Sequence, residues 1–307
     1  MWKRWTKAIR DWAHEGTPRP QTPPRIGLAL GGGFSRSLAH VGVLQVFEQH
    51  QIPIHAIAGI SSGSIIAAAY ASGTPLAEII SKGAVTTFSS YARWTLSRLG
   101  LASSERMQLW LRTILRHTNF EEMQTPLAVV ATDLITGAPV VFRDRGDIIA
   151  PVRASCSYPG LFLPLQLNGR WLVDGAVSTT VPVQAVRDLG ATHVVAVYLH
   201  SITVDGFRPA NIFQVVSQCF SILQDRIAAD ERARAELLLE PKVASFAWND
   251  FERADELVEA GRQSALEALP IIEGWLRQPL ASAAPDPGRS ITAAPAISSA
   301  AGPPLQS

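Results

Sequence analysis

Short apolar runs alternate with longer amphipathic stretches along most of this chain. The runs at residues 25–30, 53–59, 126–134 and 192–199 predict strands, because each is short and mostly apolar. The last of them is typical of a strand buried on both faces. Between the runs, apolar positions recur at helical spacing, and an Ala-rich stretch ends at Gly73, a natural helix stop. The alternation predicts an α/β fold, a three-layer sandwich with a mainly parallel central sheet flanked by helices.

The second half of the chain adds a hairpin and two long helices. Asn168-Gly169 lies between two apolar stretches and is a strong signal for a β-hairpin. Residues 211–236 have the pattern of a long amphipathic helix. A further helix is predicted after residue 250, with a bend at Pro270.

The same pattern divides the chain into three parts, residues 1–24, 25–278 and 279–307. Residues 1–16 mix Trp with Lys and Arg, and the Pro-rich residues 17–24 are typical of a linker. On a helix, four apolar side chains of the first part would share one face: Trp2, Trp5, Ile9 and Trp12. Such a face indicates either a helix in a membrane interface or a helix packed on the domain. The third part is mostly Ala, Pro and Ser, and we expect it to be disordered.

Charge is unevenly distributed between these parts. The formal net charge is +1, so the overall balance does not indicate nucleic-acid binding. Residues 1–25 nevertheless contain six basic and two acidic side chains. This positive excess favours peripheral contact between residues 1–16 and an anionic membrane surface.

Cysteine usage and hydropathy narrow the protein class further. Cys156 and Cys219 are the two cysteines, and no C-x-x-C occurs, which excludes a disulfide framework or a zinc ribbon. The sequence shows neither a secretory signal nor a run of about 18 uncharged apolar residues. We therefore expect a cytoplasmic protein, peripheral to the inner face of the membrane at most, whose oligomeric state the sequence does not predict.

Gly59-Ile60-Ser61-Ser62-Gly63 fits the pattern G-x-S-x-G and lies between a predicted strand and an Ala-rich helix. A strand-to-helix turn exposes its central residue at the carboxyl edge of the sheet. Gly59 and Gly63 allow the backbones of a tight bend to approach closely, and the helix N-terminus favours negative charge at Ser61. These are the requirements of an acyl-transfer nucleophile. A small polar turn without chemistry is the alternative.

Gly31-Gly32-Gly33 ends the first predicted strand and opens the first helix, where backbone N–H groups can bind an oxyanion. Parallel neighbouring strands would place this loop beside Ser61. A dinucleotide loop is the competing interpretation, but Arg36 stands where its third glycine is required. Residues 51–58 also lack the acidic residue that would bind a ribose.

Two residues are candidates for the general base. His200 follows a late strand, as the histidine of a Ser-His-Asp triad would, although a solvated loop histidine has the same pattern. Asp174 ends an apolar strand and precedes Gly175, so its carboxylate could accept the serine proton directly if partial burial raises its pKa. An Asx-type turn is the other interpretation of this Asp-Gly pair.

Three segments in order resemble the signatures of patatin-like phospholipases. They are "LALGGGFSRSLAHVGVL", "IAGISSGSIIAAAYASG" and "WLVDGAVSTTVPV". Two connecting segments, "VVATDLITGAPVVF" and "ASCSYPGLFLPL", also look like those of bacterial members. The resemblance covers about residues 25–270 and implies a modified α/β-hydrolase-like sheet with a Ser–Asp dyad and no catalytic histidine.

Carried over residue by residue, the resemblance implies that Ser61 is the nucleophile and Asp174 the proton acceptor. It implies oxyanion donors at the amides of Gly32 and Gly33, and it matches Arg36 to the basic residue of the loop. The glycines of the elbow and of the D-G motif are matched as well: Gly59, Gly63 and Gly175. Ser37 departs from the pattern, because the loop usually closes with glycine there.

The implied substrate is an acyl ester of lipid type, and neither a metal nor a cofactor is required. Residues 75–117 are predicted to be helical, with breaks near Ser89-Ser90 and Gly100. Within them, the apolar residues of 88–116 would form either a lid or acyl channel, or an ordinary helix face packed on the core. Two other functions stay open: a Ser-His-Asp carboxylesterase that uses His200, and a non-catalytic regulatory member that binds membranes.

Overall fold

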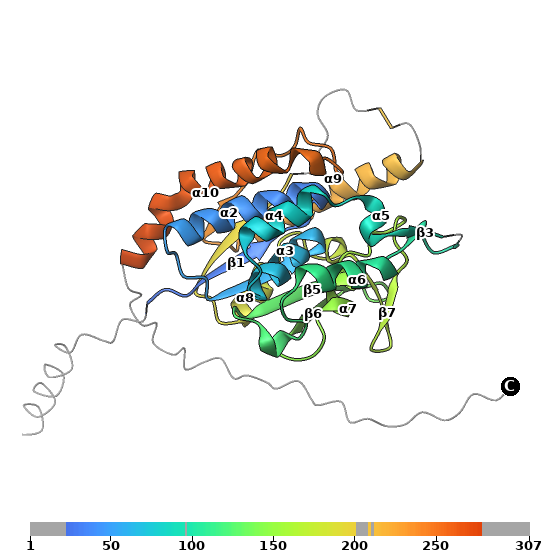
Figure 1. Ribbon diagram of the computed structural model, residues 1–307, viewed down its shortest axis with the longest axis horizontal. Helices are drawn as coiled ribbons and strands as arrows, with labels where there is room; N and C mark the ends of the chain where they lie inside the picture. Colours follow the sequence, from blue (N-terminus) through green and yellow to red (C-terminus); the bar gives the residue numbers. More distant parts are fainter. Residues whose placement is uncertain (1–22, 96, 201–207, 210–211, 278–307) are drawn as a thin grey trace, which may run out of the picture. The chain divides into compact units, whose positions relative to one another are not determined.

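The computed structural model describes residues 23–95, 97–200, 208–209 and 212–277. The expectations for the basic Trp-containing segment, most of the Pro-rich linker and the Ala/Pro/Ser tail fall on residues 1–22 and 278–307, outside the described part. Within it, the predicted three-layer α/β arrangement is confirmed: helices cover both faces of a central sheet (Figure 1).

The described sheet contains eight strands in the order β10-β9-β1-β2-β5-β8-β7, with β6 paired to β5. The strands are β1 (Ile26–Leu30), β2 (Ala56–Ile60), β5 (Leu127–Asp133), β6 (Pro139–Arg143), β7 (Leu165–Leu167), β8 (Arg170–Val173), β9 (His193–Val197) and β10 (Leu237–Leu239). The pairs of β1 with β2 and β9, of β2 with β5, and of β9 with β10 are parallel. Every residue of β1, β2 and β5 is buried, which explains why these strands are apolar or glycine throughout except for Thr132 and Asp133 at the end of β5. The predicted hairpin joins β7 and β8 through Asn168 and Gly169, both at positive φ.

The register of β1 and β2 places two loops side by side. Leu30 pairs with Gly59, so both strands end at the same edge of the sheet. The Gly-rich loop after β1 continues through a 3-10 turn, η1 (Phe34–Ser37), into α2 (Leu38–Gln49), and β2 leads directly into α3 (Ser61–Ala71). The predicted neighbourhood of the Gly-rich loop and the serine turn is therefore confirmed.

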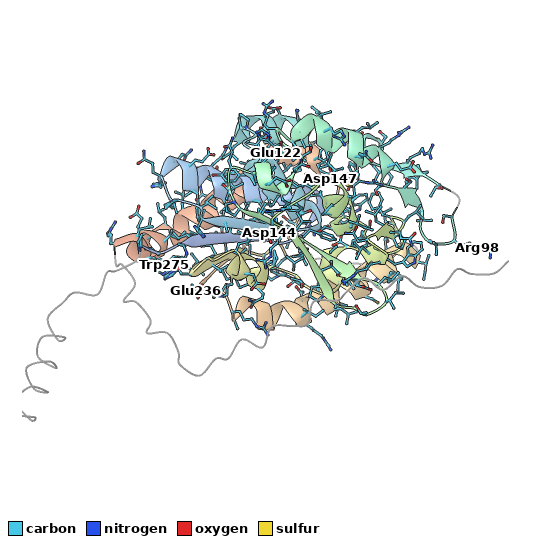
Figure 2. The ribbon with its side chains drawn as sticks, turned by 90° about the horizontal axis from the view of Figure 1, so that it is seen from below. Arg98, Glu122, Asp144, Asp147, Glu236 and Trp275 are labelled. Carbon is cyan, nitrogen blue, oxygen red and sulfur yellow. The ribbon has the colours of Figure 1, made fainter. Side chains whose placement is uncertain are left out.

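The larger of the two helical layers is built on α2. It includes α3, α4 (Leu76–Ala84), α6 (Glu105–Ile114) and α10 (Ala254–Arg277). Gly42 of α2 and Gly261 of α10 let these two helices touch backbone to backbone, because a Cβ at either position would overlap a carbonyl oxygen of the other helix. In Figure 1 the two helices lie side by side. α10 continues through Pro270 to Trp275 (Figure 2). The Trp275 ring packs on His193 at the start of β9, with ring centroids 4.8 Å apart.

The opposite face of the sheet packs on α8 (Val183–Asp188), with Phe220 of α9 (Ile212–Arg232) beside it. The other short elements are α5 (Phe88–Tyr91), α7 (Ile149–Ser155), η2 (Phe120–Glu122), η3 (Gly175–Val177) and η4 (Phe251–Arg253). No helix in the described ranges has the length and apolarity needed to cross a membrane.

The prediction of helix over residues 75–117, with breaks near Ser89-Ser90 and Gly100, is wrong for the segment between α5 and α6. A two-stranded hairpin, β3 (Arg93–Trp94) and β4 (Ala102–Ser103), separates α5 from α6. The backbone N–H groups of Leu101 and Ala102 donate to the Leu161 carbonyl, over 3.0 and 2.8 Å, instead of to a helical turn. The close approach of Gly100 to the Phe162 backbone, where a Cβ would lie 2.9 Å from the Phe162 carbonyl, supports this path.

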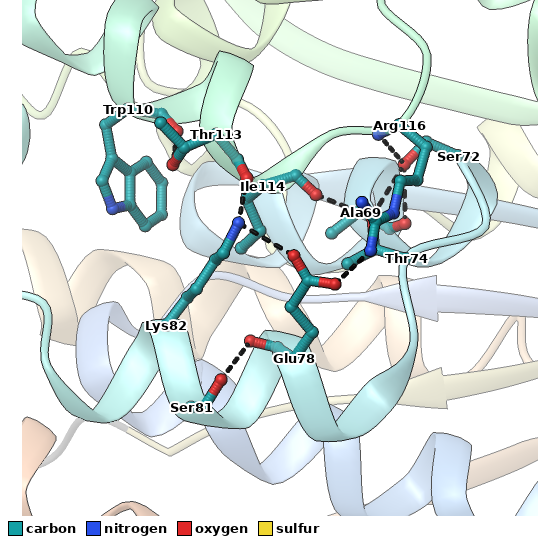
Figure 3. A network of polar contacts seen from close by, with 10 residues as sticks. All are labelled: Ala69, Ser72, Thr74, Glu78, Ser81, Lys82, Trp110, Thr113, Ile114 and Arg116. Atoms are coloured by element: carbon teal, nitrogen blue, oxygen red, sulfur yellow. Dashed lines mark hydrogen bonds and ion pairs between the residues drawn. The ribbon is translucent and has the colours of Figure 1, made fainter.

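Each of the two interpretations of residues 88–116 applies to a different part of this segment. Met107, Leu111 and Ile114 of α6 are buried in the core, whereas Trp94 and Leu99 of the hairpin are 66% and 60% exposed. Polar contacts fasten the C-terminal end of α6 to the turn between α3 and α4 (Figure 3). Among them, Thr74 donates to the Ile114 carbonyl over 2.6 Å, and the Arg116 N–H donates to the Ser72 hydroxyl over 3.1 Å. The helix is thus ordinary core, and the hairpin is the exposed part.

Candidate active site

Ser61 occupies a sharp bend between β2 and α3, with a φ of 48° in the left-handed region. Gly63 lets the end of β1 and the Gly-rich loop approach this bend closely, since a Cβ there would overlap the carbonyl oxygen of Gly31. Gly59 likewise leaves room for the backbone of Gly63 and Ser64. The G-x-S-x-G pattern therefore has a steric origin in this turn.

Ser155 of α7 holds the bend in place. The Ser61 backbone N–H donates to the Ser155 hydroxyl over 2.8 Å, and that hydroxyl donates to the Val130 carbonyl over 2.6 Å. The interaction ties the strained turn to the neighbouring strand β5. Apart from the place of Ser155 in a connecting segment, no sequence signal indicates this contact, because 94 positions separate Ser155 from Ser61.

The side chains of Ser61 and Asp174 meet at the edge of the sheet. The Ser61 hydroxyl donates to Asp174 Oδ2 over 2.7 Å, and the Ala176 N–H donates to Oδ1 over 2.9 Å. The carboxylate thus makes an Asx turn with one oxygen and contacts the serine with the other, so both interpretations of the Asp-Gly pair describe it. Gly175 packs directly on β5, where a Cβ would overlap the carbonyl oxygen of Val130.

Asp174 is fully buried, and burial raises the pKa of its carboxyl to about 7. The hydrogen bonds from the Ala176 N–H and the Ser61 hydroxyl oppose this shift, because they stabilise the carboxylate. A carboxyl group with a pKa near neutrality can accept a proton and return it at the same pH.

The Gly-rich loop faces the serine through Gly32, at which a Cβ would lie 2.9 Å from the Ser61 Cβ. The Gly32 N–H has no hydrogen-bond partner among the described residues. The Gly33 N–H, in contrast, donates to the Ser62 hydroxyl over 3.0 Å, and this hydroxyl also contacts that of Ser37. The two expected oxyanion donors therefore differ: one amide is free and the other is engaged.

His40 of α2 supports the loop from beneath. Its Nε2 lies 2.8 Å from the Gly31 carbonyl oxygen, which requires a proton on Nε2. The side chain is completely buried, its Nδ1 has no partner among the described groups, and burial lowers the pKa of the imidazole to about 4. His40 is therefore neutral at physiological pH and acts as a hydrogen-bond donor to the loop.

Arg36, the basic residue of the loop, is buried. Its Nε donates to the Phe246 carbonyl over 3.0 Å. Burial lowers the pKa of its guanidinium, and the nearby Asp250 carboxylate raises it. The Ser35 N–H donates to the Trp248 carbonyl over 3.1 Å, so two adjacent residues fasten the loop to the segment before α10.

Phe34 lines two cavities that both reach Ser61. It has a φ of 52°, unusual for a bulky side chain, and its ring lies 5.4 Å from each of the Tyr158 and Trp248 rings. The larger cavity, about 870 Å³, contains Asp174 and extends between α9 and the β3–β4 hairpin. The smaller one, about 80 Å³, is lined mainly by apolar side chains of α3, α4 and α6.

His200 is not brought to the serine. Its Nε2 lies 2.8 Å from a Glu240 carboxylate oxygen, and its ring packs edge-on against Tyr198. It does not line the cavity that contains Ser61. Within the described ranges, three or more His, Cys, Asp or Glu side chains nowhere gather as metal ligands would.

Comparison with known proteins relates this geometry to a family. The sequence profile of patatin-like phospholipases matches residues 28–187, just over half of the chain. An uncharacterized NTE family protein of Mycobacterium tuberculosis is 32% identical over 195 residues, which cover 62% of this chain and 54% of that protein. Lysophospholipase NTE1 of Cryptococcus neoformans is 30% identical over 184 residues, which cover 58% of this chain and 11% of that protein. The chain thus spans about half the length of the mycobacterial relative.

Solved structures of two bacterial proteins are more distant. VipD from Legionella pneumophila aligns with 82% of this chain and 68% of its own, with a TM-score of 0.48 and 11% identity. ExoU from Pseudomonas aeruginosa aligns with 84% of this chain and 53% of its own, with a TM-score of 0.42 and 14% identity. Neither shares enough sequence with this chain to transfer a residue's role.

Proposed function

Because this chain belongs to the patatin-like phospholipase family, we propose that it is a serine acyl hydrolase that cleaves fatty-acyl esters of lipids. Ser61 is the nucleophile and Asp174 the general base. The observation that carries the proposal is the 2.7 Å hydrogen bond from the Ser61 hydroxyl to Asp174 Oδ2, inside a cavity large enough for a lipid.

In the first step, the Ser61 oxygen attacks the ester carbonyl carbon while its proton moves to Asp174 Oδ2. The negative charge that develops on the carbonyl oxygen is stabilised by the free Gly32 N–H and by the N-terminus of α3. The tetrahedral intermediate then collapses, Asp174 returns the proton to the departing alcohol oxygen, and an acyl group remains on Ser61.

In the second step, water attacks the acyl carbonyl and gives a proton to Asp174. The Ser61 oxygen leaves, takes that proton back, and the free fatty acid is released. Asp174 can perform both transfers without an imidazole because burial raises its pKa to about 7. No step in this cycle calls for a metal ion or cofactor.

The walls of the two cavities suit an acyl ester. The larger cavity combines an apolar wall, which includes Phe88, Trp94 and Leu161, with a polar wall from α9. We infer that an acyl chain and an ester-linked polar group can be accommodated there together. The smaller apolar cavity offers additional room beside Ser61 for part of an alkyl chain.

Labelling with a fluorophosphonate probe tests the proposal. The wild-type protein is expected to form a covalent adduct on Ser61, and Ser61→Ala is expected to form none. Absence of labelling in a folded wild-type protein would favour the non-catalytic, membrane-binding alternative. Loss of labelling on His200→Ala, in contrast, would favour the Ser-His-Asp alternative.

A further inference from the structure

Helix α9 presents its polar side to the protein and its apolar side to solvent. Its inward side chains line the large cavity: Gln214, Ser217, Gln218, Ser221 and Gln224. Its outward side chains are exposed: Ile212, Val215, Val216, Ile222, Leu223 and Ile227. Residues 209–224 contain no charged side chain. A helix on the surface of a globular protein ordinarily has the reverse orientation.

Apolar side chains also occupy the other side of the cavity. Trp94, Leu99 and Leu101 of the β3–β4 hairpin are 66%, 60% and 47% exposed. Trp94 and Leu101 line the same cavity as the polar side of α9. We call the six outward residues of α9 and these three hairpin residues the apolar rim. Exposed apolar side chains gathered on both sides of one cavity mark a binding surface rather than a chance distribution.

Cations accompany the apolar rim. Arg98 lies in the hairpin loop (Figure 2), Arg208 precedes α9, and Arg226 lies on α9 itself. All three side chains are exposed, and none forms an ion pair with a described acidic residue. Aliphatic side chains, a tryptophan and exposed arginines are the combination that binds an anionic lipid interface.

We propose that the apolar rim docks on an anionic lipid bilayer, so that the large cavity opens toward the membrane. The inference rests on the proposed function, because a lipid hydrolase must receive its substrate from a bilayer. A protein partner seated on both sides of the cavity would cover the route to Ser61, whereas a bilayer seated there supplies the substrate. The polar inner side of α9 then faces the lipid's polar group, and its apolar outer side faces the acyl region.

Vesicle co-sedimentation of the full chain tests this docking, with phosphatidylcholine vesicles alone and mixed with phosphatidylglycerol. The double variant Val216→Gln, Leu223→Gln is expected to bind the mixed vesicles about tenfold more weakly. The matched control is Ile271→Gln on α10, since Ile271 is 50% exposed and the two rim residues are 46% and 57% exposed. The control is expected to bind like the wild type.

The rate of hydrolysis of a water-soluble p-nitrophenyl ester serves as the check on folding. We expect this rate to equal that of the wild type in the double variant and in the Ile271→Gln control. Leu99→Gln, in a loop, provides a second rim variant that does not alter a helix, and it is also expected to weaken binding. Wild-type binding by both rim variants would overturn the proposal. The proposal would also be overturned if the wild type were a dimer and the double variant a monomer, because α9 would then be a contact between two copies of the chain.

Ser61→Ala separates the docking from the chemistry. This variant is expected to bind vesicles like the wild type, since the rim is intact. If the wild type hydrolysed no ester and still bound through the rim, the proposed function would fail and the docking would stand. If the wild type hydrolysed soluble esters and bound no vesicles, the docking would fail and the hydrolase would stand.

Discussion

The Gly33 N–H donates to the Ser62 hydroxyl over 3.0 Å, so a residue next to the nucleophile occupies one of the two amides expected to stabilise the oxyanion. Ser62 is held in turn by the hydroxyl of Ser37, the residue that departs from the family pattern. To stabilise the oxyanion, the Gly33 N–H must break its hydrogen bond to the Ser62 hydroxyl and donate to the oxyanion instead.

Ser62→Ala removes this competing acceptor. A neutral hydrogen bond contributes about 1 kcal/mol, so kcat for a p-nitrophenyl ester is expected to rise about threefold to fivefold. Ser37→Ala is the matched control, because it deletes a hydroxyl of the same cluster and leaves Ser62 as the acceptor for Gly33. A fall in kcat for Ser62→Ala would show instead that Ser62 positions the loop.

Asp174→Asn is expected to lower kcat at least about 10³-fold, because the amide cannot accept the Ser61 proton. In the wild type, kcat/KM should rise with pH through a single ionisation near the raised pKa of Asp174, about 7, since only the carboxylate is a base. His200→Ala should leave both the rate and this profile unchanged. Stopped assays from pH 5 to about pH 9 measure the profile, and near wild-type activity of Asp174→Asn would refute the dyad.

Asp174→Asn is also expected to stabilise the fold at alkaline pH. Burial raises the folded-state pKa of Asp174 from 3.8 to about 7, so the unfolded chain loses this proton at lower pH than the folded protein does. The free energy of unfolding therefore falls as pH rises through this window. Asp174→Asn removes the dependence and should gain up to about 4 kcal/mol at pH 8 relative to pH 4. Urea titrations at both pH values measure the difference, and an equal effect at the two would contradict it.

His40 is expected to act by positioning the Gly-rich loop. His40→Leu leaves the Gly31 carbonyl without its donor, so kcat should fall about tenfold with little change in KM. His40→Gln can still donate an amide hydrogen and should recover most of this loss. A purely structural role would lower the folded fraction of both variants and leave kcat per folded molecule unchanged.

The pKa of His40 gives a second, acid-side test. Burial lowers it from 6.5 to about 4, so the unfolded chain takes up a proton at higher pH than the folded protein. The free energy of unfolding should therefore fall as pH falls through this window. His40→Gln should weaken this decline, which thermal melts at pH 4 and about pH 7 can measure.

The local sequence pattern predicts the structural features that depend only on residues adjacent in the chain. The strands, the Asn168-Gly169 hairpin and the bend at Ser61 follow from apolar runs and from residues suited to tight turns. No local pattern specifies the hydrogen bonds that Ser155 and His40 make with Ser61 and Gly31, because the tertiary fold brings these residues together. Periodicity likewise predicted an amphipathic helix over residues 211–236, but it cannot tell which side of such a helix faces the protein.

The position of β9 has a consequence for shortened forms of this protein. The family profile ends at residue 187, before β9 begins, yet β9 pairs with the whole length of β1. A polypeptide cut at that point would leave β1, all of whose residues are apolar or glycine, as an unprotected outer strand able to recruit strands from other molecules. Such a fragment would keep every signature motif and still be prone to aggregate.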